Sequence, residues 1–239
     1  MINERNTITV KEALDVYKDL MNKIELPGYI VRDIFGDNKL VIFEEDAEFD
    51  ELDLDKAFYT SDGVVGALFL KNLSVKNWII QTSCDQGGIV VVAGETKAKN
   101  IYLWGVWIAF IGKVTIEQTF AAFEANGPTN VCDEIEAEVI YGWARGLIVD
   151  FANISAKVVM GVTTYDKKTF MDIEYKSPYD PKEAIKSEYL SYDTDRYGKE
   201  IVEFNDENLE KIDDEKSSLF TAVLNGVSLL KSPLETPKK

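Results

Sequence analysis

The stretch VVVAGETKAKNIYL at residues 90–103 decides the fold, because its pattern returns in IAFIGKVTIEQTFAAF at 108–123 and in CDEIEAEVIYG at 132–142. Apolar and polar residues alternate within each stretch, which is typical of β-strands with one buried face. A similar unit recurs roughly every 20 residues over 45–161, a period that indicates a chain coiling once per unit.

Six units can be aligned on one apolar residue each. These anchors are Leu54, Val75, Ala98, Ile116, Ala137 and Ala156. A single coil cannot bury its inward side chains alone, but coils stacked one strand spacing apart share a continuous core. The pattern predicts a mainly β protein, a single-stranded β-solenoid of about six rungs, with the anchors in one buried column. Gly94 and Gly112 mark expected corners. The alternative is an antiparallel β-sandwich, whose strands also recur regularly.

Helical patterns flank the repeat. Thr9 and Glu12 have the spacing of a capping box, and apolar residues then recur at helical intervals as far as Ile24. Short strands are expected at 29–34 and 40–43, a turn at 36–37 and a last strand at 170–175. Helices are expected at 180–189 and 213–231. We therefore divide the chain into 1–43, a solenoid at 44–177 and a helical region at 178–239, with the helical pieces covering the solenoid's open ends.

The charge balance excludes several classes of function. The chain has 42 acidic and 26 basic residues, a net charge of −16, and no histidine. Such an excess repels nucleic acid and anionic membranes and attracts basic partners. The lack of histidine removes the commonest general base and zinc ligand and every Ser-His or Cys-His nucleophile. We therefore expect a protein that is not an enzyme, requires no metal or other cofactor and binds neither nucleic acid nor membrane.

The compartment is indicated by what the sequence lacks. The first ten residues, MINERNTITV, have no apolar core of a signal peptide, and the longest apolar stretch, 101–111, is too short to span a bilayer. Cys84 and Cys132 lie far apart and are expected as reduced thiols, since a disulfide would need an oxidising compartment. These features predict a cytoplasmic protein.

The densest charge cluster is EEDAEFDELDLD at residues 44–55. One interpretation is a half-buried edge strand whose acids prevent strand-to-strand aggregation. Another is a docking surface for a basic partner, and a third is a calcium site, although the glycine and ligand order of an EF-hand are missing. The candidate partner-binding acids are Glu44, Glu45, Asp46, Glu48, Asp53 and Asp55.

An apolar column supplies the second candidate surface. If the anchors point inward, the residues four positions later point outward, namely Phe58, Ile79, Tyr102, Phe120, Tyr141 and Met160. Trp104, Trp107 and Trp143 would extend this strip. A soluble protein rarely leaves such a strip bare, so it is covered either by the chain's own helices or by a protein partner. The candidate partner-binding aromatics are Tyr102, Trp104, Trp107, Phe120, Tyr141 and Trp143.

The quoted rungs resemble those of bacterial cytosolic β-solenoids. Their alternation is similar to the V-x-G-x-(I/V)-x-A-x-x-(V/I) units of bactofilins, and they also resemble small acidic β-solenoid proteins that accompany toxin genes as immunity proteins. The likeness covers about half the chain, residues 45–161. The helical N-terminus and long C-terminal region depart from the bactofilin pattern, in which short tails flank the solenoid.

The first functional expectation is an acidic immunity or antitoxin protein that neutralises a basic bacterial toxin domain by direct binding. Carboxylates would steer the toxin, and aromatic side chains would anchor it. The alternatives are a bactofilin-like scaffold or self-assembling solenoid and, third, a carbohydrate-active β-helix enzyme.

Overall fold

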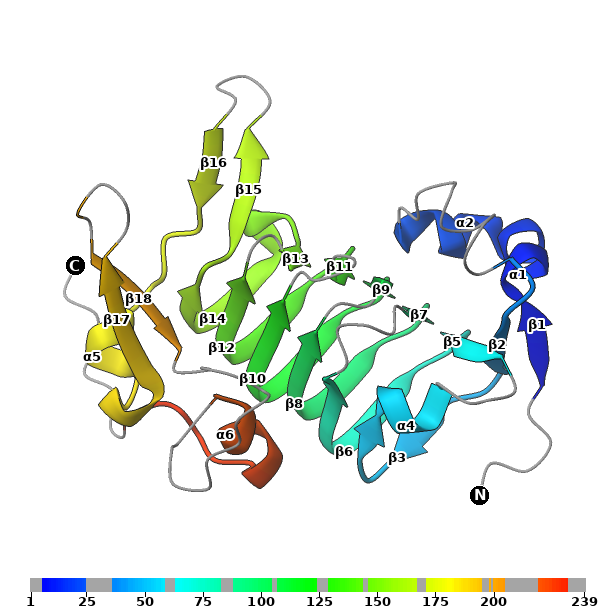
Figure 1. The fold of residues 1–239 in the computed structure, drawn as a ribbon, viewed down its shortest axis with the longest axis horizontal. Helices are drawn as coiled ribbons and strands as arrows, with labels where there is room; N and C mark the ends of the chain where they lie inside the picture. Colours follow the sequence, from blue (N-terminus) through cyan, green and yellow to red (C-terminus); the bar gives the residue numbers. More distant parts are fainter. Residues whose placement is uncertain are drawn as a thin grey trace.

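The chain forms a β-solenoid of about five turns in a computed structural model that describes residues 6–24, 36–58, 63–82, 88–104, 107–123, 129–143, 146–166, 171–194, 198, 200–204 and 219–231. Figure 1 shows its strands stacked side by side along one axis. All pairs between successive turns are parallel, so the mainly β solenoid is confirmed and the antiparallel sandwich is wrong.

Two sheets make up the solenoid, and the chain passes from one to the other in each turn. Sheet A contains, in spatial order, β1 (Thr7–Thr9), β2 (Lys39–Phe43), β5 (Val64–Phe69), β7 (Ile89–Val92), β9 (Trp107–Phe110), β11 (Thr129–Val131) and β13 (Leu147–Ile148). Sheet B runs from β14 (Ile154–Met160) through β12 (Ile135–Trp143), β10 (Val114–Phe123), β8 (Thr96–Trp104) and β6 (Leu73–Gln81) to β3 (Ala47–Phe49), with β4 (Leu52–Asp53) also paired to β6.

Five short corners join β2, β5, β7, β9 and β11 of sheet A to the next strand of sheet B. These corners occupy residues 44–46, 70–72, 93–95, 111–113 and 132–134. Gly94 and Gly112 stack at two of them, as predicted: a Cβ on Gly112 would lie 2.5 Å from the carbonyl oxygen of Gly94. The return connections from sheet B to sheet A differ in length, and this explains why the sequence period varies.

The predicted column of anchors is correct for five of its six members. Val75 and Ile116 both pair with Ala98, and Ala137 pairs with Ala156. Leu54 is wrong, because Phe49 is the residue that pairs with Val75. Leu54 instead begins a helix that the sequence did not predict, α4 (Leu54–Phe58).

Helix α4 closes the first turn of the solenoid. Its Leu54 and Phe58 are buried in the core, where Phe58 meets Phe69 edge to face at 6.2 Å and Phe43 stacks on Phe69 at 4.5 Å. Aromatic pairs of this geometry stabilise a core beyond the area they bury. Helix α4 thus takes the place of the strand residues that the repeat predicted at 54–58.

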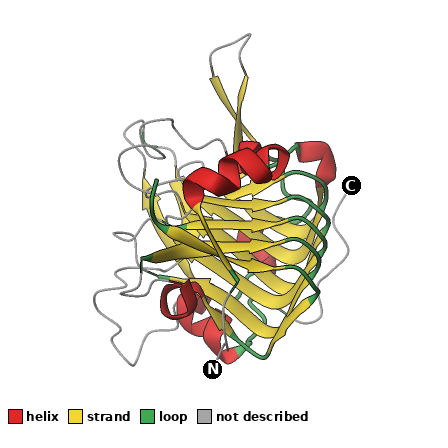
Figure 2. Cartoon of the chain, turned by 90° about the vertical axis from the view of Figure 1, so that its right-hand side faces the viewer, coloured by secondary structure: helices red, strands yellow, loops and turns green. Residues whose placement is uncertain are grey.

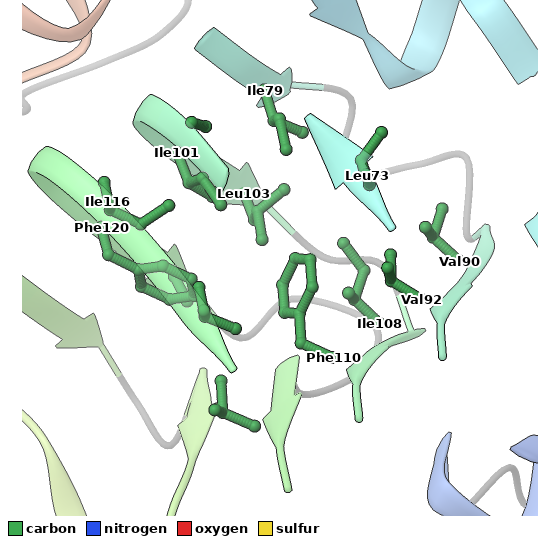
Figure 3. Close-up of a cluster of buried hydrophobic side chains, with 14 of the residues drawn as sticks. Leu73, Ile79, Val90, Val92, Ile101, Leu103, Ile108, Phe110, Ile116 and Phe120 are labelled. Atoms are coloured by element: carbon green, nitrogen blue, oxygen red, sulfur yellow. The ribbon is translucent and has the colours of Figure 1, made fainter. Parts of the chain in front are cut away.

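The core lies between the two sheets. Figure 3 shows inward side chains of sheet B, such as Ile101 and Phe120, meeting those of sheet A, such as Val92 and Phe110. Phe110 and Phe120 pack edge to face at 6.2 Å. Burial of this continuous apolar row supplies the main stabilisation of a stacked repeat.

Two irregularities change which residues face inward. Strands β6 and β10 each hold one extra residue relative to β8, between Val75 and Trp78 and between Ile116 and Thr119. The extra residue shifts the pairing by one position, so that both Ile79 and Phe120 pair with Ile101, which faces the inner core. Ile79 and Phe120 therefore join the inner core, although they were expected to point outward.

The N-terminal helices lie over the outer face of sheet A. The predicted helix consists of α1 (Val10–Val16), α2 (Lys18–Met21) and the 3₁₀ turn η1 (Asn22–Ile24). Thr9 and Glu12 form the predicted capping box. Val10, Ala13, Met21 and Ile24 pack on the outward residues of sheet A, so these helices cover a face rather than an open end. The turn at 36–37 is present, whereas 25–35 lie outside the described residues.

The C-terminal region covers the outer face of sheet B. It comprises α5 (Pro181–Ala184), the 3₁₀ turn η4 (Ser187–Tyr189), the antiparallel hairpin of β17 (Leu190–Thr194) and β18 (Glu200–Phe204), and α6 (Leu219–Asn225). Asp180 caps α5 as predicted, but the helix is shorter than 180–189. Residues 213–218 of the predicted last helix lie outside the described part of the chain. Figure 1 shows α6 against sheet B, and Figure 2 shows helices around the stacked strands.

Both ends of the stack differ from a regular rung. At one end β1 pairs antiparallel to β2. At the other, the segment 175–179 runs beside β14, where Tyr179 N donates to Lys157 O at 3.2 Å and Val159 N to Ser177 Oγ at 3.0 Å. A hairpin of β15 (Thr163–Asp166) and β16 (Met171–Glu174) projects from this end. The turn η3 (Phe151–Asn153) precedes β14.

Candidate functional site

The acidic first turn, residues 44–55, lies at the terminal edge of sheet B. Ala47, Leu52 and Leu54 are buried, whereas Glu48 on β3 is exposed. The remaining exposed acids of the turn are Glu44, Glu45, Asp46, Asp50 and Glu51. The interpretation as a half-buried edge strand with an acidic outer side thus fits the geometry, and the same acids form a compact negative surface.

Asp53 and Asp55 hold α4 in place. Asp53 accepts a hydrogen bond from Lys56 N at 3.2 Å and forms a 2.7 Å ion pair with Lys56, which raises the pKa of that lysine. Asp55 accepts from Thr82 N at 2.8 Å and from Gln81 Nε2 at 3.3 Å. Both carboxylates are only partly exposed, so the two residues serve the fold and are poor candidates for partner binding.

Three acids at the first corner also have contacts within the chain. Glu44 accepts from Asn6 Nδ2 at 3.1 Å, and Asp46 accepts from Asn72 N at 3.1 Å. Glu45 pairs with Lys71 and raises the pKa of that lysine. Because these groups are solvent-exposed, each contact is weak and leaves the carboxylate accessible.

The other two exposed acids of the turn lie between β3 and β4. Asp50 reaches Lys76 at 3.9 Å, and Glu51 lies at the rim of a pocket described below. Among the residues placed in the structure, no three Cys, Asp or Glu side chains come together in a way that could hold a metal ion. No helix among the described residues is long and apolar enough to cross a membrane.

Four of the six aromatic candidates are not at the surface, and two of these four, Phe120 and Trp107, do not belong to the expected outward strip of sheet B. Trp107 faces the N-terminal helices, Phe120 faces the inner core, and Tyr102 and Tyr141 lie under the C-terminal region. Tyr102 contacts Phe220 at 5.1 Å between ring centroids, and Tyr141 contacts Phe204 at 5.1 Å. The alternative expectation, coverage by the chain's own C-terminal elements, describes this face.

Two aromatic candidates keep surface exposure. Trp104 and Trp143 end β8 and β12, and their rings lie 6.3 Å apart at 22°. Phe123 of β10 stacks on Trp104 at 4.7 Å and is itself buried. Trp143 is 42% exposed, whereas Trp104 is half-buried. Both residues therefore stay candidates for partner binding.

A polar pocket adjoins the acidic first turn. It has a volume of about 160 Å³ and lies where α6 ends over sheet B. Its lining comprises Glu51, Asn77, Trp78, Lys99, Asn100 and residues 223–226. The sequence did not single out this site, because the alignment of the repeats places Trp78 in the same column as Ile101, which faces inward; the extra residue in β6 pairs Trp78 with Asn100 instead, on the outer face of sheet B. A bulge signal would have been needed to find it.

One side chain of this pocket fastens α6 to the sheet. Asn100 is 1% exposed, and its Nδ2 donates to Val223 O at 3.3 Å and to Gln118 Oε1 at 3.1 Å. Its Oδ1 accepts from Thr119 N at 3.0 Å, the amide that follows the bulge of β10. Asn100 is therefore satisfied by the fold, and Glu51, Asn77, Trp78 and Lys99 are the side chains left to meet a ligand.

Comparison with protein-family models, with curated proteins and with solved structures found no match for this chain.

Proposed function

We propose that the protein is a binding protein of the immunity or antitoxin kind, which neutralises a basic toxin domain by docking it on the acidic first turn. The observation that carries the proposal is the group of exposed acids at 44–51 on the terminal strand of sheet B, in a chain of net charge −16. The negative electrostatic field of such a chain raises the rate at which it meets a basic partner, and a local cluster of acids gives that encounter a preferred orientation.

Short-range binding needs apolar contact as well as charge. Interface energy is concentrated in a few well-packed residues, among which Trp, Tyr and Arg are enriched. Trp143 and Trp104 are the candidate aromatic residues at the surface. The other four are buried: Tyr102, Trp107, Phe120 and Tyr141. In this proposal the acids set the orientation of the partner and the rate of encounter, and the exposed tryptophans slow the dissociation of the complex.

Co-purification from the source organism tests the proposal. The four-site variant Glu44→Gln, Glu45→Gln, Asp46→Asn and Glu48→Gln removes four charges while keeping hydrogen-bond acceptors at the first corner. Its matched control removes four charges from acids exposed elsewhere: Glu117, Glu174, Glu183 and Glu188. Both variants have the same net charge, so a difference between them reports the location of the acids.

We expect the native protein and the control to retain one basic protein, to bind it directly when both are purified, and to block its toxicity. The four-site variant should retain much less. Binding that is equal for the two variants, or the absence of any directly bound basic protein, would refute the proposal.

A further inference from the structure

We infer that the open edge of β3 receives an extended basic segment of the partner, which adds one strand to sheet B. This inference deepens the proposed function and rests on it for the source of the segment. β3 is the terminal strand of sheet B (Figure 1), and within the described residues it pairs only with β6. A terminal strand presents unpaired backbone N–H and C=O groups, with which an extended peptide can form a further ladder of hydrogen bonds.

The backbone of Glu48 faces this open edge. Ala47 N donates to Asn72 O at 2.9 Å, so the amide of Ala47 points toward β6. In a parallel ladder, alternate residues of a strand bond to the same neighbour. The N–H and C=O of Glu48 therefore point away from β6, toward the edge. The side chains alternate as well: those of Ala47 and Phe49 pack against the inner core, whereas that of Glu48 is exposed on the outer face.

The other ends of the two sheets offer less to an incoming strand. At the far end of sheet B, the segment 175–179 runs beside β14, where Tyr179 N donates to Lys157 O at 3.2 Å. At one end of sheet A, the N–H of Thr9 in β1 already donates to Glu12 Oε2 at 3.0 Å. At the other end, β13 has only two residues. Among the edges that the structure describes, β3 is therefore best suited to receive a strand.

The charges at this edge favour a basic segment over a second copy of the chain. A second copy would bring its own acids against those of the first turn, and like charges opposite each other in a sheet are destabilising. A lysine or arginine beside Glu48 would instead form a favourable cross-strand pair. Phe49 is partly exposed and packs against the inner core, so an apolar residue beside it would bury more of its ring. The edge thus fits a segment in which basic and apolar residues alternate.

A titration without the partner tests this inference. The probe is the acetylated and amidated pentapeptide Lys-Val-Lys-Val-Lys, whose alternation matches the outer and inner sides of the edge. We expect it to slow hydrogen exchange of the Glu48 amide by about tenfold at about nine-tenths saturation, since only the free protein then exchanges. The control peptide carries N-methyl groups on its three central residues. It keeps every charge and side chain but cannot pair as a strand, so it should bind more weakly and leave that amide unprotected.

Two substitutions at one position separate the backbone from the charge. Glu48→Pro removes the outward N–H, and proline is tolerated on an edge strand whose N–H faces solvent. Glu48→Gln removes the same charge but keeps the N–H. By the chemical shifts of neighbouring amides, the proline variant should bind the peptide at least about fivefold more weakly than the glutamine variant, the loss expected for one hydrogen bond. Thermal melts show whether both variants are folded.

The inference is overturned if the two peptides bind equally well, or if the Glu48 amide stays unprotected when the native protein is saturated. Either result would mean that the acids attract the lysines without strand pairing. The peptide comparison uses the native protein, so it decides the matter even if Glu48→Pro does not fold. Failure of this titration removes strand addition alone, whereas failure of docking is read from the four-site variant and its control.

Discussion

Replacing Asn100 by alanine tests how the C-terminal region is held on sheet B. The change removes three hydrogen bonds: to Val223 O at 3.3 Å, to Gln118 Oε1 at 3.1 Å and from Thr119 N at 3.0 Å. Val223 O keeps a bond from Gly226 N at 3.2 Å, and Gln118 is only half-buried and can reach water. The cost is therefore concentrated at Thr119 N, which stays buried in the sheet.

The magnitude follows from these contacts. A buried donor left without an acceptor costs about 1–3 kcal/mol, and the net loss of a further hydrogen bond costs about 1 kcal/mol. Asn100→Ala should therefore lower the free energy of unfolding by about 2–4 kcal/mol. Denaturant unfolding measures this value, and hydrogen exchange should show faster opening of α6 than of β8.

The matched control is Asn77→Ala. Asn77 is half-buried at the neighbouring rung and lines the same pocket. Its loss should change stability by less than about 0.5 kcal/mol, as for most surface substitutions. If Asn100→Ala lowers the free energy of unfolding no more than Asn77→Ala does, then Asn100 does not hold α6 on sheet B and the reasoning is refuted.

Three further predictions concern the fold. Thr96 Oγ1 is buried without a hydrogen-bond partner in the described part of the chain, so Thr96→Val should stabilise the protein by about 1 kcal/mol in denaturant unfolding, and a loss would contradict this. Gly112→Ala should lower the melting temperature markedly, because its Cβ would lie 2.5 Å from the carbonyl oxygen of Gly94, and an unchanged melt would argue against the stacked corners. Burial, with Glu188 beside it, raises the pKa of Tyr189. The folded state therefore favours the neutral phenol, and this contribution is present below the unfolded pKa of about 10 and lost as the pH rises above it. Urea unfolding between pH 9 and 10.5 should show a smaller loss of stability for Tyr189→Phe than for the native protein; equal losses would contradict the prediction.

The repeat could be predicted where the residue pattern and the strand register agree. The pairing of Val75 with Ala98 and of Ala137 with Ala156, and the stacked glycines at 94 and 112, follow from the spacing of apolar residues and corners. The first turn could not be predicted, because Leu54 fits the apolar pattern equally well as a strand residue and as the start of a buried helix.

Bulges limited the prediction of the candidate site. One extra residue in β6 and in β10 moves the inward position from three residues after the anchor, as for Ile101 in β8, to four residues after it, so Ile79 and Phe120 lie in the core and Trp78 does not. Both faces of these strands are apolar over this region, so hydrophobic alternation carries no sign of the shift. The cover formed by β17, β18 and α6 depends on contacts between distant segments, such as Tyr141 with Phe204.

The measurement that tests the central claim most directly is the association rate of the purified basic partner as a function of salt. Beyond about 8 Å, interactions between exposed charges are largely screened at physiological ionic strength, so a steered association slows as salt rises. The four-site variant should associate about tenfold more slowly than its equally charged control at low salt, and the two should converge at high salt. Equal rates for the two variants at low salt would contradict docking on the acidic first turn.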